Sequence, residues 1–324
     1  MQARRTTPWV RVGLEGLGWA LTAAGSAAVV FRAIPPLQLL NGVTVMASAF
    51  IPYGLPALAG AAVIFATSPK RRLRPLAAAA VGGAVLLAWW AKPYWPAPAP
   101  ASGGDSLTLL TMNLRFSHSG ASHLAALAQR TGADVVVVQG FDSTQRRALG
   151  DAWSQALPHS TFHPMARQSG CGTLVASRTP LRTLSAPEGT QLVVEFDRPG
   201  GPVVLLPVDL PTPTNGVPPW LDAFAHLSEA VRAHRDRPLV VAGDFNAVRE
   251  HEPLRRLLQD TGLRDAAEGA GAGWTPTFPS RSWHPPLLGL DHVLIGAPLG
   301  ASEIRTEAIA GQEHRALIVR IEGA

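Results

Sequence analysis

The residues best suited to chemistry follow a short apolar run near residue 240. The segment VVAGDFNAV, residues 240–248, predicts a buried strand and a glycine turn, followed by Asp244 and Asn246. Side chains two residues apart in an extended segment point the same way, so a carboxylate and a carboxamide would project together. A Gly-Asp turn closed by an Asx hydrogen bond explains the same letters. This segment alone leaves a reactive site and a structural turn equally open.

Four further segments place polar residues at the ends of predicted strands. Asn113 ends the strand predicted in LTMNLRF, and Gly140 ends DVVVVQG. Asp291 begins the strand in GLDHVLIG, and QEHRALIV places Glu313 and His314 before the last strand. In order and spacing, these segments and GDFN resemble the endonuclease/exonuclease/phosphatase superfamily. That superfamily includes DNase I, exonuclease III, sphingomyelinases and inositol-polyphosphate phosphatases.

The resemblance implies hydrolysis of a phosphoester with Mg²⁺ or Mn²⁺ as cofactor. Asp244 would orient and deprotonate the attacking water, while Asn246 and Asn113 would hydrogen-bond the phosphoryl group. His314 would be the charged partner of the phosphoryl oxygens. Asp291 would accept the other ring proton of His314 and so fix its tautomer.

Three positions depart from the family pattern. Gly140 stands where the family has a metal-binding Glu, Asp209 stands where many members have a phosphate-contacting His, and Glu313 replaces an Asp. The resemblance assigns metal binding to Glu313. Two residues could compensate for the missing Glu: Asp142, two residues beyond Gly140, and Asp209, which adds a negative charge. Since a hard cation needs ligand charge, Gly140→Glu is expected to tighten Mg²⁺ binding unless the longer side chain clashes.

Residues 105–324 alternate short β-branched runs with Ala- and Leu-rich segments, which predicts an α/β domain. Strands are predicted at 107–112, 134–138, 172–177, 191–196, 203–208, 239–242, 291–295 and 317–321. Helices are predicted at 122–131, 221–235 and 253–261. The resemblance implies a DNase I-like four-layer α/β sandwich, in which two mixed β-sheets are flanked by helices.

Residues 1–93 predict a membrane anchor with three transmembrane helices. Apolar stretches cover 13–31, 37–67 and 76–91, and the second has 31 residues without a charge. That length exceeds a core helix of a domain this size and is enough to cross about 30 Å of hydrocarbon. A signal peptide would explain the first stretch. However, two more stretches follow it, and no small-x-small cleavage motif precedes a soluble domain.

The basic residues predict the orientation of the anchor, because Lys and Arg resist translocation. The N-terminal tail and the loop before the third stretch carry most of them: Arg4, Arg5, Arg11, Lys70, Arg71, Arg72 and Arg74. With both segments in the cytoplasm, the third crossing places the following chain outside the cell membrane. Residues 94–104, YWPAPAPASGG, predict a Pro/Ala-rich and then Gly-rich linker to the domain at 105–324.

Charge bears on the substrate class. Residues 1–104 carry nine Lys or Arg against one acid, net +8, and the remainder carries 19 basic and 22 acidic residues, net −3. A surface that binds duplex DNA needs cations to replace condensed counterions, so nucleic acid is disfavoured as a partner. The single Cys171 excludes an internal disulfide.

Location favours a phosphorylated lipid or a prenyl phosphate as substrate, since the predicted domain is tethered outside a membrane. The three-span layout resembles membrane-anchored actinobacterial members of the superfamily. A second class of function stays open because of Gly140 and Asp209. It is a catalytically inactive domain that binds a phosphorylated envelope ligand or a partner protein.

Overall fold

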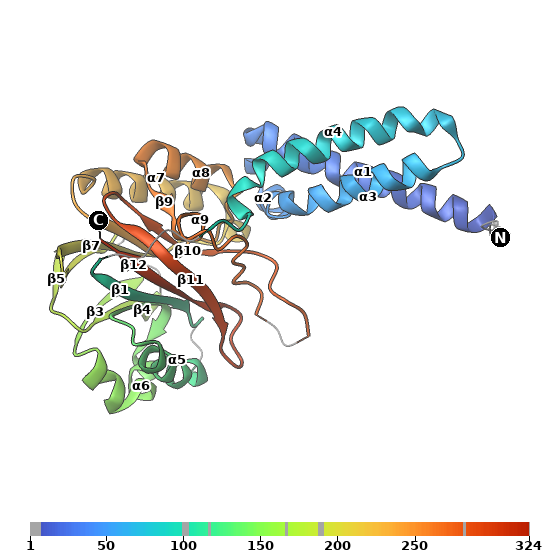
Figure 1. Ribbon diagram of the computed structural model, residues 1–324. Helices are drawn as coiled ribbons and strands as arrows, with labels where there is room; N and C mark the ends of the chain where they lie inside the picture. Colours follow the sequence, from blue (N-terminus) through green and yellow to red (C-terminus); the bar gives the residue numbers. More distant parts are fainter. Residues whose placement is uncertain are drawn as a thin grey trace. The chain divides into compact units, whose positions relative to one another are not determined.

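The computed structural model describes residues 8–98, 104–115, 118–165, 168–186, 191–280 and 283–323. The chain forms two compact units (Figure 1). One comprises Met1–Pro93 with Glu250–Glu252, and the other comprises Tyr94–Arg249 with Pro253–Ala324.

The N-terminal unit is built from apolar helices that pack closely at small residues. Its helices are α1 (Pro8–Ala33), α2 (Gly42–Ser48), α3 (Gly54–Thr67) and α4 (Arg74–Trp90). A Cβ on Gly25 of α1 would lie 2.3 Å from the Leu58 side chain of α3, and one on Gly54 would lie 2.4 Å from Ala28. Such contacts are typical of helix pairs in membranes, where van der Waals packing drives association.

The described residues hold two or three segments that could span a membrane. Two helices are long and apolar enough to do so, Val12–Ala33 and Arg71–Trp90. A third span arises only if the helix pair Gly42–Ser48 and Ile51–Thr67, bent by 48°, is counted as one. The continuous span expected at 37–67 is therefore bent. The Asn41 side chain caps α2 and starts a new helix inside the apolar run, and Pro52 lacks the N–H that would extend α2.

Two six-stranded mixed sheets form the centre of the second unit. The first runs β11 (Gly300–Ala308), β12 (Arg315–Glu322), β1 (Ser106–Asn113), β2 (Val135–Asp142), β4 (Gln168–Ser177), β3 (His159–Met165). The second runs β5 (Leu181–Ser185), β6 (Val193–Arg198), β7 (Gly201–Asp209), β8 (Leu239–Asp244), β10 (Asp291–Ile295), β9 (Arg264–Asp265). The pairs β1–β2 and β7–β8 are parallel, and the other neighbours are antiparallel.

Helices cover the outer faces of both sheets (Figure 1). They are α5 (His118–Thr131) and α6 (Ser143–Ala156) on the first sheet, and α7 (Val217–Ala233) and α8 (Glu252–Thr261) on the second, with the short α9 (Ala266–Gly269) near β9. Strand alternation separates two cores: Leu109 packs between the sheets, while Leu110 packs under α5. The predicted four-layer α/β sandwich is confirmed.

The strands that the sequence did not predict are the edge strands. In the part of the chain that the structure describes, the sheets end in β11, β3, β5 and β9, and none of these was expected. Edge strands face a neighbour on one side only and carry polar residues, as in GASEIRTEA of β11, so they lack the apolar runs of inner strands. Helices α6 and α9 were missed as well, and Gly150 inside α6 has a φ of 74°.

The first half of the predicted linker packs on the second unit. The Tyr94 ring lies 4.8 Å from that of Trp274, and the Ala97 N–H donates to the Gly271 carbonyl at 3.0 Å. Gly271 has a φ of +64°, and a Cβ on it would lie 2.3 Å from the Ala97 carbonyl oxygen. Residues 94–97 therefore pack within the second unit, and the linker expected at 94–104 stays a prediction. Residues 99–103 lie outside the described part of the chain.

We expect Gly271→Ala to lower the free energy of unfolding of a 94–324 fragment by about 2–4 kcal/mol. The alanine would have to adopt a positive φ, and its Cβ would clash with the Ala97 carbonyl oxygen. Gly262→Ala is the matched control. Gly262 has a φ of +74°, but a Cβ on it would meet no atom within 4 Å, so the substitution should cost about 1–2 kcal/mol. Chemical denaturation measures both. In a 105–324 fragment, which lacks Ala97, the two costs should become equal. An unchanged difference would contradict packing of the linker.

Candidate active site

The strand ends bring together polar residues from both sheets. Asn113 ends β1, and His314 directly precedes β12. In the second sheet, Asp244 at the end of β8 pairs with Asp291 of antiparallel β10 and with Asp209 of parallel β7. This register places three carboxylates side by side at one end of the sheet.

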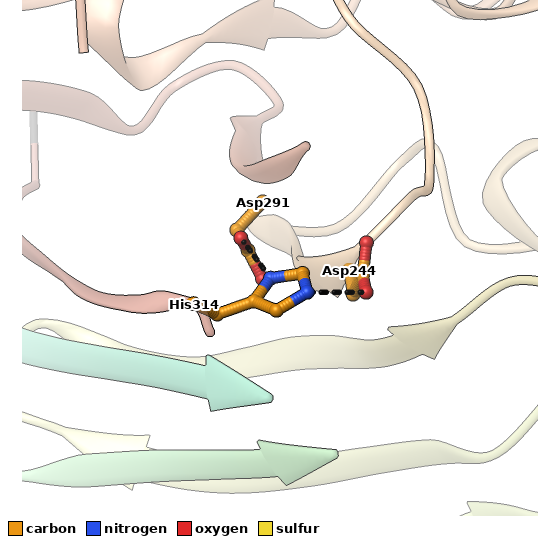
Figure 2. A group of neighbouring side chains, drawn as sticks. All are labelled: Asp244, Asp291 and His314. Atoms are coloured by element: carbon orange, nitrogen blue, oxygen red, sulfur yellow. Dashed lines mark hydrogen bonds and ion pairs between the residues drawn. The ribbon is translucent and has the colours of Figure 1, made fainter. Parts of the chain in front are cut away.

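His314 is the centre of this group (Figure 2). Its Nδ1 lies 2.8 Å from Oδ2 of Asp291, and its Nε2 lies 3.9 Å from Oδ2 of Asp244. All three side chains are almost fully buried, and the Phe278 ring covers the imidazole with 5.0 Å between centroids. Burial alone would lower the pKa of His314, but the charge and hydrogen bond of Asp291, followed by Asp244, raise this pKa to about 9. The imidazole is therefore a cation at neutral pH.

Asp244 is oriented by two hydrogen bonds. The Asn113 Nδ2 donates to its Oδ2 at 2.8 Å, and the Asn246 backbone N–H donates to its Oδ1 at 2.8 Å. Burial, followed by the charge of Asp291, raises the pKa of Asp244 to about 6. The Asn246 side-chain amide donates to the Leu210 carbonyl at 2.8 Å, so Asn246 also fixes the loop. Phosphoryl binding by Asn113 and Asn246 stays a prediction.

Asp209, whose negative charge the sequence offered as a possible replacement for the missing family Glu, lies beside Asp244. Burial, followed by the charge of Asp244, raises the pKa of Asp209 to about 7. The Gly140 backbone N–H donates a hydrogen bond to it. The available signal was position: Asp209 ends the strand that runs parallel to the one ending in Asp244.

Asp142 and Glu313, the expected metal ligands, have other contacts. Asp142 is the N-cap of α6 and accepts hydrogen bonds from the Thr144 and Gln145 backbone N–H groups at 2.8 and 2.9 Å. Glu313 is exposed and forms an ion pair with Arg115. Neither residue is in the group of possible ligands, Asp244, Asp291 and His314, found among the described residues. The structure therefore gives no support for metal binding by these two side chains.

Gly140 has no room for the glutamate that the family carries at this position. Its φ is +57°, and a Cβ on it would lie 2.7 Å from the Arg115 backbone nitrogen and 2.9 Å from Oδ1 of Asn113. The turn after β1 thus fills the space that a side chain would need. A side chain at this position clashes, so Gly140→Glu is not expected to tighten Mg²⁺ binding. The substitution would strain the backbone rather than restore a ligand.

One buried oxygen marks the place where a cation fits. Oδ1 of Asp291 is buried and has no hydrogen-bond partner among the described residues, while Oδ2 binds His314. Carboxylate oxygens of Asp244 and Asp291 lie within 4.8 Å of each other, and the parallel register places Asp209 beside Asp244. The protonated His314 has no free lone pair, so these carboxylates are the groups available to a cation. A buried carboxylate oxygen without a partner is costly, and carboxylates are the ligands that hard divalent cations prefer.

Comparisons with known proteins agree with this architecture. Residues 110–311 match the model of the Endonuclease/Exonuclease/phosphatase family. A solved endonuclease/exonuclease/phosphatase from Beutenbergia cavernae is 19% identical with a TM-score of 0.51, covering 68% of this chain and 72% of that one. A family protein from Bacteroides thetaiotaomicron is 14% identical with a TM-score of 0.53, covering 68% and 99%. Truncated TDP2 from Caenorhabditis elegans is 14% identical with a TM-score of 0.52, covering 68% and 98%.

The comparison with curated proteins gave no match. At these identities the solved structures show the fold alone, a sandwich of two mixed sheets flanked by helices. The family match covers more than half of the chain and includes Asp244 and Asp291. From this match and the shared fold, we conclude that the chain belongs to the endonuclease/exonuclease/phosphatase family, whose members are mostly hydrolases that use divalent metals.

Proposed function

We propose that this protein is a membrane-tethered, divalent-metal-dependent phosphoester hydrolase whose catalytic unit acts outside the cytoplasm. The observation that carries the proposal is the buried array of Asp244, His314 and Asp291, in which one carboxylate oxygen of Asp291 has no hydrogen-bond partner among the residues that the structure describes. An acid-base pair and a position for a cation then lie together at the strand ends.

Each side chain has a defined task in this reaction. Asp244, held by Asn113 and the Asn246 N–H, accepts the proton from an attacking water. His314 is protonated and donates to the phosphoryl oxygens, while Asp291 holds the ring in place. Asp209 and the free oxygen of Asp291 would hold Mg²⁺ or Mn²⁺. The ion, when bound, neutralises charge on the phosphoryl group.

A phosphorylated lipid or a prenyl phosphate is the substrate class that we propose. The chain carries two or three segments able to span a membrane, so its second unit would work near a lipid surface. The net charge of −3 after residue 104 gives little attraction for the phosphate backbone of DNA. The distribution of Lys and Arg residues around the apolar segments supports an extracytoplasmic catalytic unit.

A second candidate is a non-catalytic domain that binds a phosphorylated ligand. It is favoured by the contacts of the two expected metal ligands, since Glu313 pairs with Arg115 and Asp142 caps α6, and by the lack of space for a carboxylate side chain at Gly140. In that case His314 would bind phosphate without turnover. Binding that depends on His314, combined with no metal-dependent hydrolysis, would identify this function.

Asp244→Asn should lower kcat on phosphomonoester or phosphodiester model substrates by at least about 100-fold, because an amide cannot accept the proton from water. Asp142→Asn is the matched control. Asn caps a helix as well as Asp does, so this variant should retain wild-type kcat and the same response to a Mg²⁺ or Mn²⁺ titration. Weaker metal dependence in Asp142→Asn would instead support the original assignment of Asp142 as a ligand.

The raised pKa values of Asp209 and Asp244, about 7 and about 6, predict a pH effect on stability. The folded state holds these protons more tightly than the unfolded state, so metal-free protein should lose stability as pH rises from 4 through 7. Asp209→Asn should be more stable than wild type at pH 8 by about 1–2 kcal/mol, a difference that shrinks toward pH 4.

Chemical denaturation with a chelator measures this difference. The control is Asp236→Asn, whose exposed carboxylate lies outside the site and should leave the pH profile unchanged. Added Mg²⁺ or Mn²⁺ should stabilise wild type more than Asp209→Asn at pH 8. Equal stabilisation would remove Asp209 from the proposed ligands.

The cation distribution also predicts topology. A reporter that is active only outside the cytoplasm should be active when fused after Gly104 and silent when fused after Arg72. The two fusion points flank the segment Arg71–Trp90, so they test its crossing directly. The reverse pattern would place the catalytic unit in the cytoplasm.

A further inference from the structure

Hydrogen bonds from several segments hold the backbone of the loop that follows β8. The Asp244 carbonyl accepts from the Leu210 N–H at 2.9 Å, and the Phe245 N–H donates to the Leu290 carbonyl at 3.0 Å. Asn246 has a φ of 47°, which non-glycine residues rarely adopt. Such a conformation persists only where its surroundings impose it. Two further carbonyls of the loop, those of Phe245 and Ala247, accept hydrogen bonds from side chains elsewhere in the unit.

His292 holds the Ala247 carbonyl. It follows Asp291 in β10, so strand alternation turns its side chain to the opposite face of the sheet. The buried ring lies between Oδ2 of Asp265, 2.7 Å from Nδ1, and the Ala247 carbonyl, 2.9 Å from Nε2. A carboxylate and a carbonyl both accept hydrogen bonds, so the ring donates from both nitrogens and is an imidazolium. Asp265 balances its charge and also caps α9 through Oδ1.

Trp220 holds the Phe245 carbonyl from α7. The side chain is fully buried, and its Nε1–H donates to this carbonyl at 3.2 Å. The Phe245 ring in turn lies edge-on to His292, with 5.6 Å between centroids. The two donors therefore fix adjacent parts of one loop from two different elements.

We infer that His292 and Trp220 are positioning residues, which hold the loop in the conformation that presents Asp244 and Asn246 to substrate. The inference rests on the proposed function for its kinetic consequence, and on the hydrogen bonds alone for its structural one. Both residues act through the loop and neither belongs to the acid-base array. Displacement of a reacting group by about 1 Å can reduce rate on the order of 100-fold.

The experiment uses full-length protein in detergent with His292→Gln and Trp220→Phe. His292→Gln removes the ring and its charge, and Trp220→Phe removes the Nε1–H donor. Each variant keeps a side chain of related size. Trp153→Phe is the matched control, a buried Trp under the first sheet that does not contact this loop. We expect kcat to fall about 10-fold to 100-fold in both variants with KM nearly unchanged, and to stay at the wild-type value in Trp153→Phe.

Amide hydrogen exchange provides a readout that does not need activity. Exchange at 245–248 should speed up at least about 10-fold in His292→Gln and Trp220→Phe, with α5 unchanged. The inference would be overturned by unchanged exchange in the loop. It would also be overturned if kcat fell no further in His292→Gln and Trp220→Phe than in Trp153→Phe. If one variant fails to fold, the other decides it, because the two donors lie on different elements. An inactive wild type would instead count against the proposed function, while the exchange result would still test the loop.

Discussion

Three carboxylates lie close to a single imidazole in the second unit, and two of them, Asp244 and Asp291, are almost fully buried, so their charges are costly to maintain. Asp209, Asp244 and Asp291 lie on neighbouring strands and repel one another, and burial deprives them of water. The His314 cation offsets part of this cost, since its hydrogen bond to Asp291 keeps the imidazole protonated. A shift of one residue in strand register would turn these side chains to opposite faces. The sheet geometry and the charge balance therefore depend on each other.

The same crowding explains where the negative charge of the site lies. The family pattern has a carboxylate on the first sheet at position 140, where this chain has Gly140 and the turn from Asn113 to Arg115 leaves no space for a side chain. The second sheet instead supplies Asp209, and the Gly140 backbone N–H donates to that carboxylate. A glycine with positive φ and an additional aspartate thus occur together, and the acidic character of the site is kept with a different arrangement.

Strand β10 serves the site from both of its faces. Asp291 points to His314, whereas the next residue, His292, points to the opposite face and binds the loop after β8. Two adjacent residues therefore control both the orientation of the imidazole and the backbone that carries Asp244. Two adjacent residues can do this because successive side chains of a strand point to opposite faces of the sheet.

Apolar patterning by itself determined the inner strands, the three main helices that were predicted and the helical character of the N-terminal unit. Inner strands are buried on both faces, so their sequences are runs of β-branched or apolar residues. Motif order identified Asp244, Asp291, His314 and Asn113, which the structure brings together at the strand ends.

Only the tertiary structure decided which polar groups are partners. Asn113 and Asp244 are 131 residues apart, and His292 and Ala247 are 45 apart, yet each pair is joined by a hydrogen bond. The occupied space beside Gly140 and the position of Asp209 beside Asp244 likewise depend on atoms from distant segments. A local sequence pattern records whether a residue is buried, whereas hydrogen-bond partners and available space are set by the strand register that brings those segments together.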